Sequence, residues 1–227
     1  MVVEKLSYAA HVPPGEGPFP ALIALHGWGA NAHDLFGLAP MIHDGKAVVL
    51  CPQGPVRMGI GGGMAGYGWF PFTPGQPPDV EAFKAAADAL RGFIDAALER
   101  FPIDPARVAL AGFSQGGIMA YELALREPGR FSGLAALSAW FPEPLANLLP
   151  KVPEHEGFPV LVVHGTRDPS IPVERAREAR EALRSYGVAL MYREFDMGHE
   201  IHKDALRVIL RWLDERAFVR EAAAASP

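Results

Sequence analysis

The chain has 227 residues, of which 49% are hydrophobic, enough for one large core but few for two independent domains. Its formal net charge of −5, with both signs scattered, gives no basic stripe for nucleic acid and no cationic helix for a membrane surface. Cys51 is the only cysteine, which excludes an internal disulfide and a cysteine metal cluster, and without a signal peptide or membrane anchor we expect a cytoplasmic protein.

In the first half of the chain, short apolar runs alternate with helical patterns. We expect an edge strand or hairpin arm at 2–12, a buried strand at 20–26, a short helix at 33–43, a strand at 47–51 and a long irregular stretch at 55–78. Asp79 is a candidate N-cap for a long helix. The apolar residues of this helix recur at core-facing spacing: Phe83, Ala87, Leu90, Ile94, Leu98 and Phe101.

The second half repeats the alternation. We expect a strand from 108 and a helix at 118–125, a strand at 131–138, a Pro-rich loop at 139–158, strands at 159–164 and 189–195, a helix after Pro172, a final helix over 201–212 and a frayed tail at 218–227. The pattern predicts an α/β fold over a single domain, 1–227. Its central sheet would be mostly parallel, with about seven strands, helices on both faces and no large cap domain.

The segment Gly112-Phe113-Ser114-Gln115-Gly116 lies between the strand and the helix in the middle of the chain. A serine at the apex of a sharp strand-to-helix turn needs small neighbours two residues away on each side, and both are glycines here. The turn would expose Ser114 Oγ at the carboxyl edge of the sheet, beside the positive end of a helix. We interpret Ser114 as a nucleophile, although G-x-S-x-G alone is a weak pattern.

Ligands in open α/β sheets bind at the carboxyl ends of the strands, so the partners of Ser114 are sought there. Asp168 follows the strand at 159–164 and His199 follows the last strand, in the order Ser, Asp, His that is expected of α/β-hydrolases. Imidazole can take the serine proton and return it, while a buried carboxylate orients the ring. Asp196 and His202 are the rivals. Asp168 as a helix cap and His199 as an ordinary loop histidine are the structural alternatives.

A tetrahedral oxyanion needs two fixed donors. We assign one to the backbone N–H of Gln115, directly after the nucleophile, and the other to the backbone N–H of Trp28, in the loop after the strand at 20–26. His26 is expected only to brace that loop. Cys51 is expected to be a buried strand-end residue without a redox role.

Several motifs resemble the phospholipase/carboxylesterase family of small α/β-hydrolases, which includes bacterial carboxylesterases and acyl-protein thioesterases. They occur in the family's order over residues 18–213: Leu25-His-Gly-Trp-Gly, Cys51-Pro-Gln-Gly-Pro, Trp69-Phe70, Gly112-Phe-Ser-Gln-Gly-Gly117, Val163-His-Gly-Thr-Arg-Asp168 and Met197-Gly-His-Glu-Ile201. The resemblance implies a serine esterase without metal or organic cofactor, with its triad on Ser114, Asp168 and His199.

This chain departs from the thioesterase pattern in three places. Ala30-Asn31 follows the glycine-rich loop where that branch usually has an aspartate, Pro71 replaces another aspartate, and Trp28 is larger than the usual leucine. We therefore expect short or medium acyl esters and a pocket narrowed by aromatic residues. The candidates are Trp28, Tyr67, Trp69, Phe70 and Phe72, although the same residues could simply pack a long loop onto the core.

The same fold and triad are compatible with other functions. A thioesterase or lysophospholipase uses the same chemistry on another substrate. An amidase or peptidase is less expected because no propeller or cap domain is seen, and a non-catalytic binding protein is less expected because the triad is intact. The expected partner is a small-molecule ester. Exposed aromatics on the long loops would serve equally to pack a homodimer or to line the substrate entrance.

Overall fold

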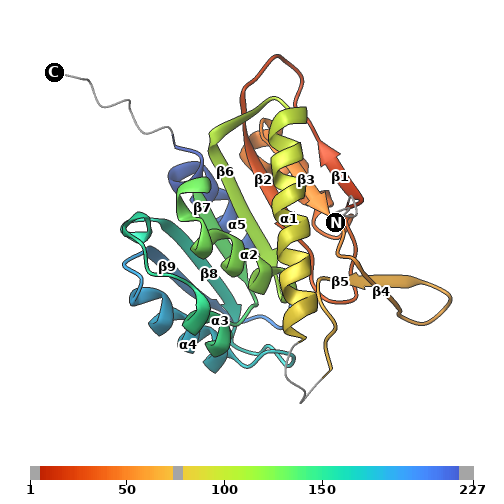
Figure 1. Cartoon of the computed structure of the whole chain (residues 1–227), viewed down its shortest axis with the longest axis vertical. Helices are drawn as coiled ribbons and strands as arrows, with labels where there is room; N and C mark the ends of the chain where they lie inside the picture. The colour runs from red at the N-terminus through yellow and green to blue at the C-terminus, as the bar shows by residue number, and fades with distance from the viewer. Residues whose placement is uncertain (1–5, 74–78, 220–227) are drawn as a thin grey trace.

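The computed structural model describes residues 6–73 and 79–219. At its centre is a seven-stranded sheet with strand order β1-β3-β2-β6-β7-β8-β9 (Figure 1). Strand β1 is antiparallel to β3, and the other neighbouring strands pair in parallel, as predicted. The strands are β1 (Tyr8–His11), β2 (Phe19–Leu25), β3 (Val48–Pro52), β6 (Ile103–Phe113), β7 (Gly133–Leu137), β8 (Pro159–Gly165) and β9 (Ala189–Phe195).

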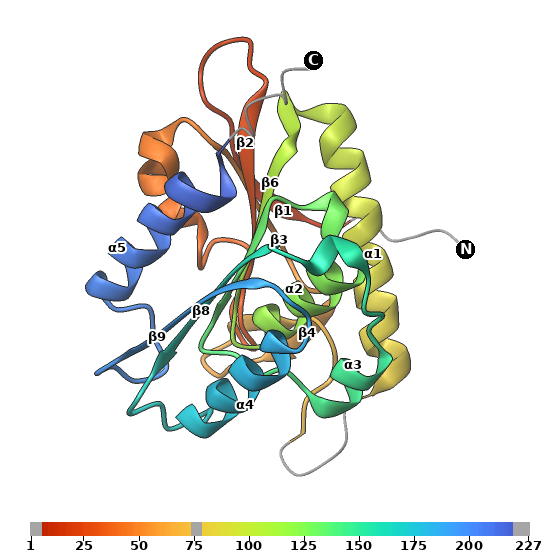
Figure 2. The same cartoon turned by 90° about the vertical axis from the view of Figure 1, so that its left-hand side faces the viewer.

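Helices cover both faces of the sheet, which confirms the predicted fold class (Figure 2). One face packs against α1 (Val80–Arg100), α2 (Gln115–Arg126), α3 (Glu143–Leu148) and α4 (Val173–Arg184). The other packs against the 3₁₀ segment η1 (Phe36–Gly45), helix α5 (Lys203–Trp212) and the π-helical turn η4 (Leu213–Ala217). Two further 3₁₀ turns are η2 (Pro128–Arg130) and η3 (Pro153–His155). None of the helices in the described part of the chain is long and apolar enough to cross a membrane.

Helix α1 begins and packs as its sequence predicts. The Asp79 side chain accepts a hydrogen bond from the Ala82 backbone N–H at 3.0 Å, which satisfies one of the free donors of the first turn. The predicted apolar stripe faces the sheet, because its central residues Ala87, Leu90 and Ile94 are buried in the core. The helix is therefore held by one continuous apolar face.

Three segments differ from the prediction. The irregular stretch at 55–78 contains the hairpin β4 (Val56–Gly59) and β5 (Ala65–Gly68), and the loop at 139–158 contains α3. The helix expected at 33–43 is η1, which is 3₁₀ in character and contains Pro40, a residue without the N–H that an α-helix needs. The parts of the predicted edge strand, long loop and tail that fall on residues 1–5, 74–78 and 220–227 lie outside the described residues.

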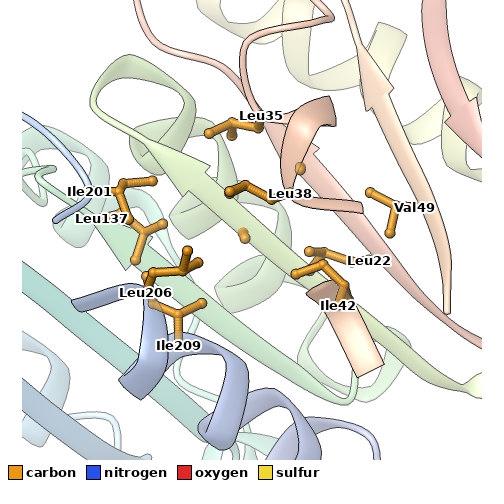
Figure 3. A pocket seen from close by; sticks show the side chains of 11 residues that line it. Leu22, Leu35, Leu38, Ile42, Val49, Leu137, Ile201, Leu206 and Ile209 are labelled. Carbon is orange, nitrogen blue, oxygen red and sulfur yellow. The ribbon is translucent and has the colours of Figure 1, made fainter. Parts of the chain in front are cut away.

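A small apolar cavity lies between η1, the sheet and α5 (Figure 3). Its volume is about 20 Å³. Its labelled lining residues come from these elements and from the residues just before η1 and α5: Leu22, Leu35, Leu38, Ile42, Val49, Leu137, Ile201, Leu206 and Ile209. This volume is about enough for one water molecule and much smaller than a ligand pocket. We interpret the cavity as imperfect packing beneath the carboxyl edge of the sheet.

Candidate active site

Ser114 lies at the turn between β6 and α2. Its backbone has φ 53° and ψ −118°, in a region that non-glycine residues rarely occupy and that costs roughly 1–3 kcal/mol. The turn is held from both sides, because the Ser114 N–H donates to the Leu137 carbonyl at 2.9 Å and the Gly117 N–H donates to the Ser114 carbonyl at 2.9 Å. Such strain is characteristic of functional sites.

The two glycines around Ser114 are required by close backbone contacts. A Cβ atom at Gly112 would lie 2.2 Å from the carbonyl oxygen of Gly116, and one at Gly116 would lie 2.2 Å from the carbonyl oxygen of Leu25. Any side chain at either position would therefore force the strand and the helix apart. The second contact also presses the start of α2 against the end of β2, where the loop with Trp28 begins.

Asp168 and His199 form a direct pair. The His199 Nδ1 atom lies 2.7 Å from Asp168 Oδ2, and the Asp168 side chain is fully buried. The other carboxylate oxygen, Oδ1, accepts hydrogen bonds from the backbone N–H groups of Ser170 at 2.8 Å and Ile171 at 2.9 Å. Asp168 thus contacts His199 and also organises the loop before α4. It does not cap that helix, because the N-cap residue of α4 is Pro172.

Backbone contacts bring the loops after β2, β6, β8 and β9 together. A Cβ atom at Gly27 would lie 3.3 Å from Ser114 Cβ, so the loop of Trp28 touches the serine turn. A Cβ atom at Gly165 would lie 2.3 Å from the Met197 carbonyl oxygen, so the loop of Asp168 touches the loop of His199. The ring of His199 packs on Phe113, the residue before Ser114, with 4.8 Å between ring centroids. All the predicted triad and oxyanion residues therefore gather at one edge of the sheet.

A network of buried hydrogen bonds fixes both expected oxyanion donors. The Gln115 side chain accepts from the Trp69 backbone N–H at 2.7 Å and donates to the Phe70 carbonyl at 2.8 Å. The indole N–H of Trp69 donates to the His26 carbonyl at 2.8 Å. Trp69 thus links the start of α2 to His26, which directly follows β2 and lies two residues before Trp28. We refer to Trp69, Gln115 and His26 as the clamp.

His26 is fully paired in one neutral tautomer. The Gly54 backbone N–H donates to Nε2 at 3.0 Å, so the hydrogen of the neutral ring is on Nδ1, which donates to the Gly27 carbonyl at 2.8 Å. Burial lowers the pKa of His26 from its ordinary value, against smaller raising effects from the Gly27 hydrogen bond and Asp34. The side chain braces its loop, as the sequence analysis anticipated. Burial also raises the pKa of the Cys51 thiol to about 12, with a smaller contribution from Asp34.

The five candidate pocket aromatics fall into two groups. Trp69 and Phe70 are 0% and 2% exposed, and both belong to the hydrophobic core, as expected if they only pack the loop. Trp28 and Tyr67 are half-buried, and Phe72 is exposed. Trp28 contacts Phe72 edge-to-face at 6.2 Å between centroids, and Phe72 contacts Trp140 at 6.4 Å. We call Trp28, Phe72 and Trp140 the aromatic row.

The β4–β5 hairpin is attached to the loop of Trp28. The Gly29 N–H donates to the Tyr67 carbonyl, and the Tyr67 N–H donates to the Ala30 carbonyl, each at 2.8 Å. Tyr67 therefore holds the glycine-rich loop through its backbone. Figure 1 shows the hairpin extending beside the carboxyl ends of β2 and β3.

The rival residues are placed away from the pair. The Asp196 side chain is 80% exposed and forms an ion pair with Arg167. His202 is the N-cap of α5, where its Nδ1 accepts from the Asp204 N–H at 3.4 Å. Sequence reasoning missed two residues near the site, Trp140 and His164. Trp140 lies in the loop after β7 and His164 is the penultimate residue of β8, so nearness to the end of a buried strand was the available signal.

Comparisons with known proteins agree with this arrangement. The sequence model of the phospholipase/carboxylesterase family matches residues 7–216. The chain is 28% identical over 171 residues to a probable SOBER1-like carboxylesterase of Arabidopsis thaliana, covering 73% of this chain and 64% of that protein. It is 27% identical over 186 residues to acyl-protein thioesterase 1 of Gibberella zeae, covering 77% of each. The chain thus spans just under two thirds of the Arabidopsis relative's length.

Solved structures share the fold over nearly the whole chain. The crystal structure of esterase PE8 superposes with a TM-score of 0.79 at 26% identity, covering 93% of this chain and 99% of that one. The Bacillus cereus carboxylesterase superposes with a TM-score of 0.78 at 22% identity, covering 93% and 95%. The second likeness concerns the fold alone.

Proposed function

The chain belongs to the phospholipase/carboxylesterase family, and we propose that it is a serine carboxylesterase that hydrolyses carboxylic esters of short to medium acyl chain. The observation that carries the proposal is the 2.7 Å hydrogen bond between His199 Nδ1 and the buried Asp168, at the sheet edge where the strained turn presents Ser114. This combination supplies a nucleophile, a base and an orienting carboxylate without a metal or cofactor.

The proposed reaction has two steps. Ser114 Oγ attacks the ester carbonyl while His199 Nε2 takes its proton, and the ring then protonates the leaving alcohol. Water attacks the acyl-enzyme with the same His199 as base, and the acid leaves. Asp168 keeps the hydrogen of the neutral ring on Nδ1, which leaves Nε2 free to accept the serine proton.

The oxyanion of each tetrahedral intermediate would be held by the backbone N–H groups of Trp28 and Gln115. The contacts of Gly27 with Ser114 and of Gly116 with Leu25 support this assignment, because the loop of Trp28 packs against the turn that contains Ser114 and Gln115. Each donor comes from a segment that the clamp immobilises. Fixed donors stabilise the developing charge without reorganising during the reaction.

The clamp can be tested with Trp69→Phe, which removes the indole N–H and leaves the buried His26 carbonyl without its donor. We expect unfolding free energy to fall by about 2–3 kcal/mol in urea denaturation. We also expect kcat to fall by about tenfold, since the Trp28 N–H loses its fixed position. Trp212→Phe is the control, because Trp212 is equally buried but contacts Gly133 at the opposite end of the sheet. Equal kcat values for the two variants would refute a role for the clamp in turnover.

The proposed acyl preference rests on the aromatic row, which lies along the loops after β2 and β7 and the segment after β5. With p-nitrophenyl esters from acetate to palmitate, we expect the wild type to prefer short or medium chains. Trp28→Leu should move the optimum to longer chains, because each further CH₂ that can be buried contributes about 0.8 kcal/mol. Phe93→Leu, a half-buried site on α1, should not move it. A wild-type preference for palmitate would contradict the narrowed pocket.

The second candidate is a thioesterase, and the 27% identical relative named acyl-protein thioesterase favours it. Matched oxygen ester and thioester substrates with the same acyl group distinguish the two. A much higher kcat/KM for the thioester would make the thioesterase assignment the better one. A cytoplasmic location and a homodimer stay predictions.

A further inference from the structure

A second histidine, His164, lies behind the Asp168–His199 pair. It is the penultimate residue of β8, and its side chain is 0% exposed. Its Nε2 atom lies 2.8 Å from the Ile171 carbonyl oxygen and 3.5 Å from Asp168 Oδ2, the same oxygen that accepts from His199. His164 is thus a fully buried neighbour of the carboxylate, whereas the His199 side chain is partly exposed.

The hydrogen on His164 can be assigned from these partners. A carbonyl oxygen can only accept, so Nε2 carries the hydrogen and donates to Ile171. The same N–H dipole is then close to Asp168 Oδ2. The other ring nitrogen, Nδ1, is buried and has no hydrogen-bond partner among the described residues. The ring is therefore held at one end only, the end that faces the loop of Asp168.

Three N–H groups donate to the buried carboxylate: the backbone N–H groups of Ser170 and Ile171 to Oδ1, and His199 to Oδ2. The Nε2 atom of His164 lies 3.5 Å from Oδ2, while its hydrogen is directed at the Ile171 carbonyl. A buried carboxylate can rotate about its terminal bond, so its plane is fixed only when both of its oxygens accept hydrogen bonds. His164 packs its Nε2–H edge beside Oδ2 and donates to the carbonyl of Ile171, the residue whose own N–H is one of the donors to Oδ1.

We propose that His164 is a positioning residue that acts through Asp168: its Nε2–H anchors the Ile171 carbonyl and faces Asp168 Oδ2, and so fixes the carboxylate that orients His199. This inference rests on the proposed function. A carboxylate free to turn would leave His199 out of line for proton transfer, and misplacement of a reacting group by about 1 Å can cost about 10²-fold in rate. The group does not touch substrate, so the effect falls on kcat rather than KM.

The test compares side chains that differ in where they place a donor. Gln sets its amide nitrogen near the position of His Nε2, whereas Asn sets it near Nδ1 and falls short of Ile171 and Asp168. We expect His164→Gln to retain kcat within about threefold, and His164→Asn and His164→Leu to lose roughly 10- to 100-fold with little change in KM. Thermal unfolding of each variant is measured alongside, and if H164L does not fold the Gln and Asn pair decides.

His155→Leu is the matched control. His155 is also 0% exposed and also has its Nε2 close to a backbone carbonyl, that of Leu125, at 2.7 Å, but it lies on η3 away from Asp168. The His155→Leu substitution should lower the free energy of unfolding and leave kcat unchanged. Equal kcat for H164Q and H164N, or equal kcat for H164L and H155L, would overturn the proposal. Failure of the proposed function is distinct, because then the wild type itself would hydrolyse neither esters nor thioesters.

Discussion

Ser114→Ala is expected to lower kcat for ester hydrolysis by about 10⁶-fold. The residual rate is the one that the oxyanion N–H donors and substrate binding support without a nucleophile. The hydroxyl oxygen is the atom that becomes acylated, so no neighbouring group can replace it. The backbone at φ 53° should persist, since alanine and serine carry the same Cβ penalty in that region. We therefore expect an unchanged thermal unfolding midpoint together with loss of turnover.

The measurement is steady-state hydrolysis of a p-nitrophenyl ester within the preferred chain length. Ser185→Ala is the control, because Ser185 is exposed at the end of α4 and its hydroxyl bonds only to its own helix. Retention of wild-type turnover in S114A would remove the serine from the mechanism. In that case the ester would be hydrolysed through a group other than Ser114, and the fold would not determine the mechanism.

Asp168→Asn is expected to lower kcat by about 10⁴-fold while the loop keeps its structure. The amide oxygen can still accept from the N–H groups of Ser170 and Ile171, so the amide NH₂ must face His199 in place of Oδ2. His199 Nδ1 then has to accept a hydrogen bond, which moves the ring hydrogen to Nε2. A ring protonated at Nε2 cannot take the proton of Ser114.

Asp196→Asn is the matched control for this variant. Asp196 was the rival acid in the sequence, and its side chain is exposed and paired with Arg167. We expect its kcat to stay within about twofold of the wild type, as for most surface substitutions. A large loss in D196N with little loss in D168N would reverse the assignment of the orienting acid.

The sheet and the site residues were predictable because each has a local signal. Buried strands are continuous apolar runs, and the residues after them meet at one edge whatever the details of the connections. Asp168 and His199 could be chosen in this way although they are 31 residues apart. The Gly-x-Ser-x-Gly pattern likewise reflects a backbone contact, that of Gly112 with Gly116, which forces the residue type.

The missed features depend on tertiary contacts. The β4–β5 hairpin has four-residue strands joined by glycines at 61–63 with positive φ. Strands this short within a Gly-rich stretch give too little periodicity to be recognised from the sequence. For Trp69 the sequence left pocket lining and loop packing as alternatives, and only the structure shows that its indole N–H is paired in the core. In the sequence, His164 is only the last residue of the apolar strand predicted at 159–164, which indicates no role in the site. Only the folded chain shows that its ring reaches Asp168.

Mass spectrometry after reaction with a fluorophosphonate, which phosphonylates activated serines, tests whether Ser114 is the nucleophile. We expect one added phosphonyl group per wild-type chain, located on the peptide that contains Ser114, and none on S114A. We also expect slower labelling of D168N, because the base is then in the wrong tautomer. Labelling of S114A at the wild-type rate, or a wild-type adduct on any residue other than Ser114, would exclude Ser114 as the nucleophile.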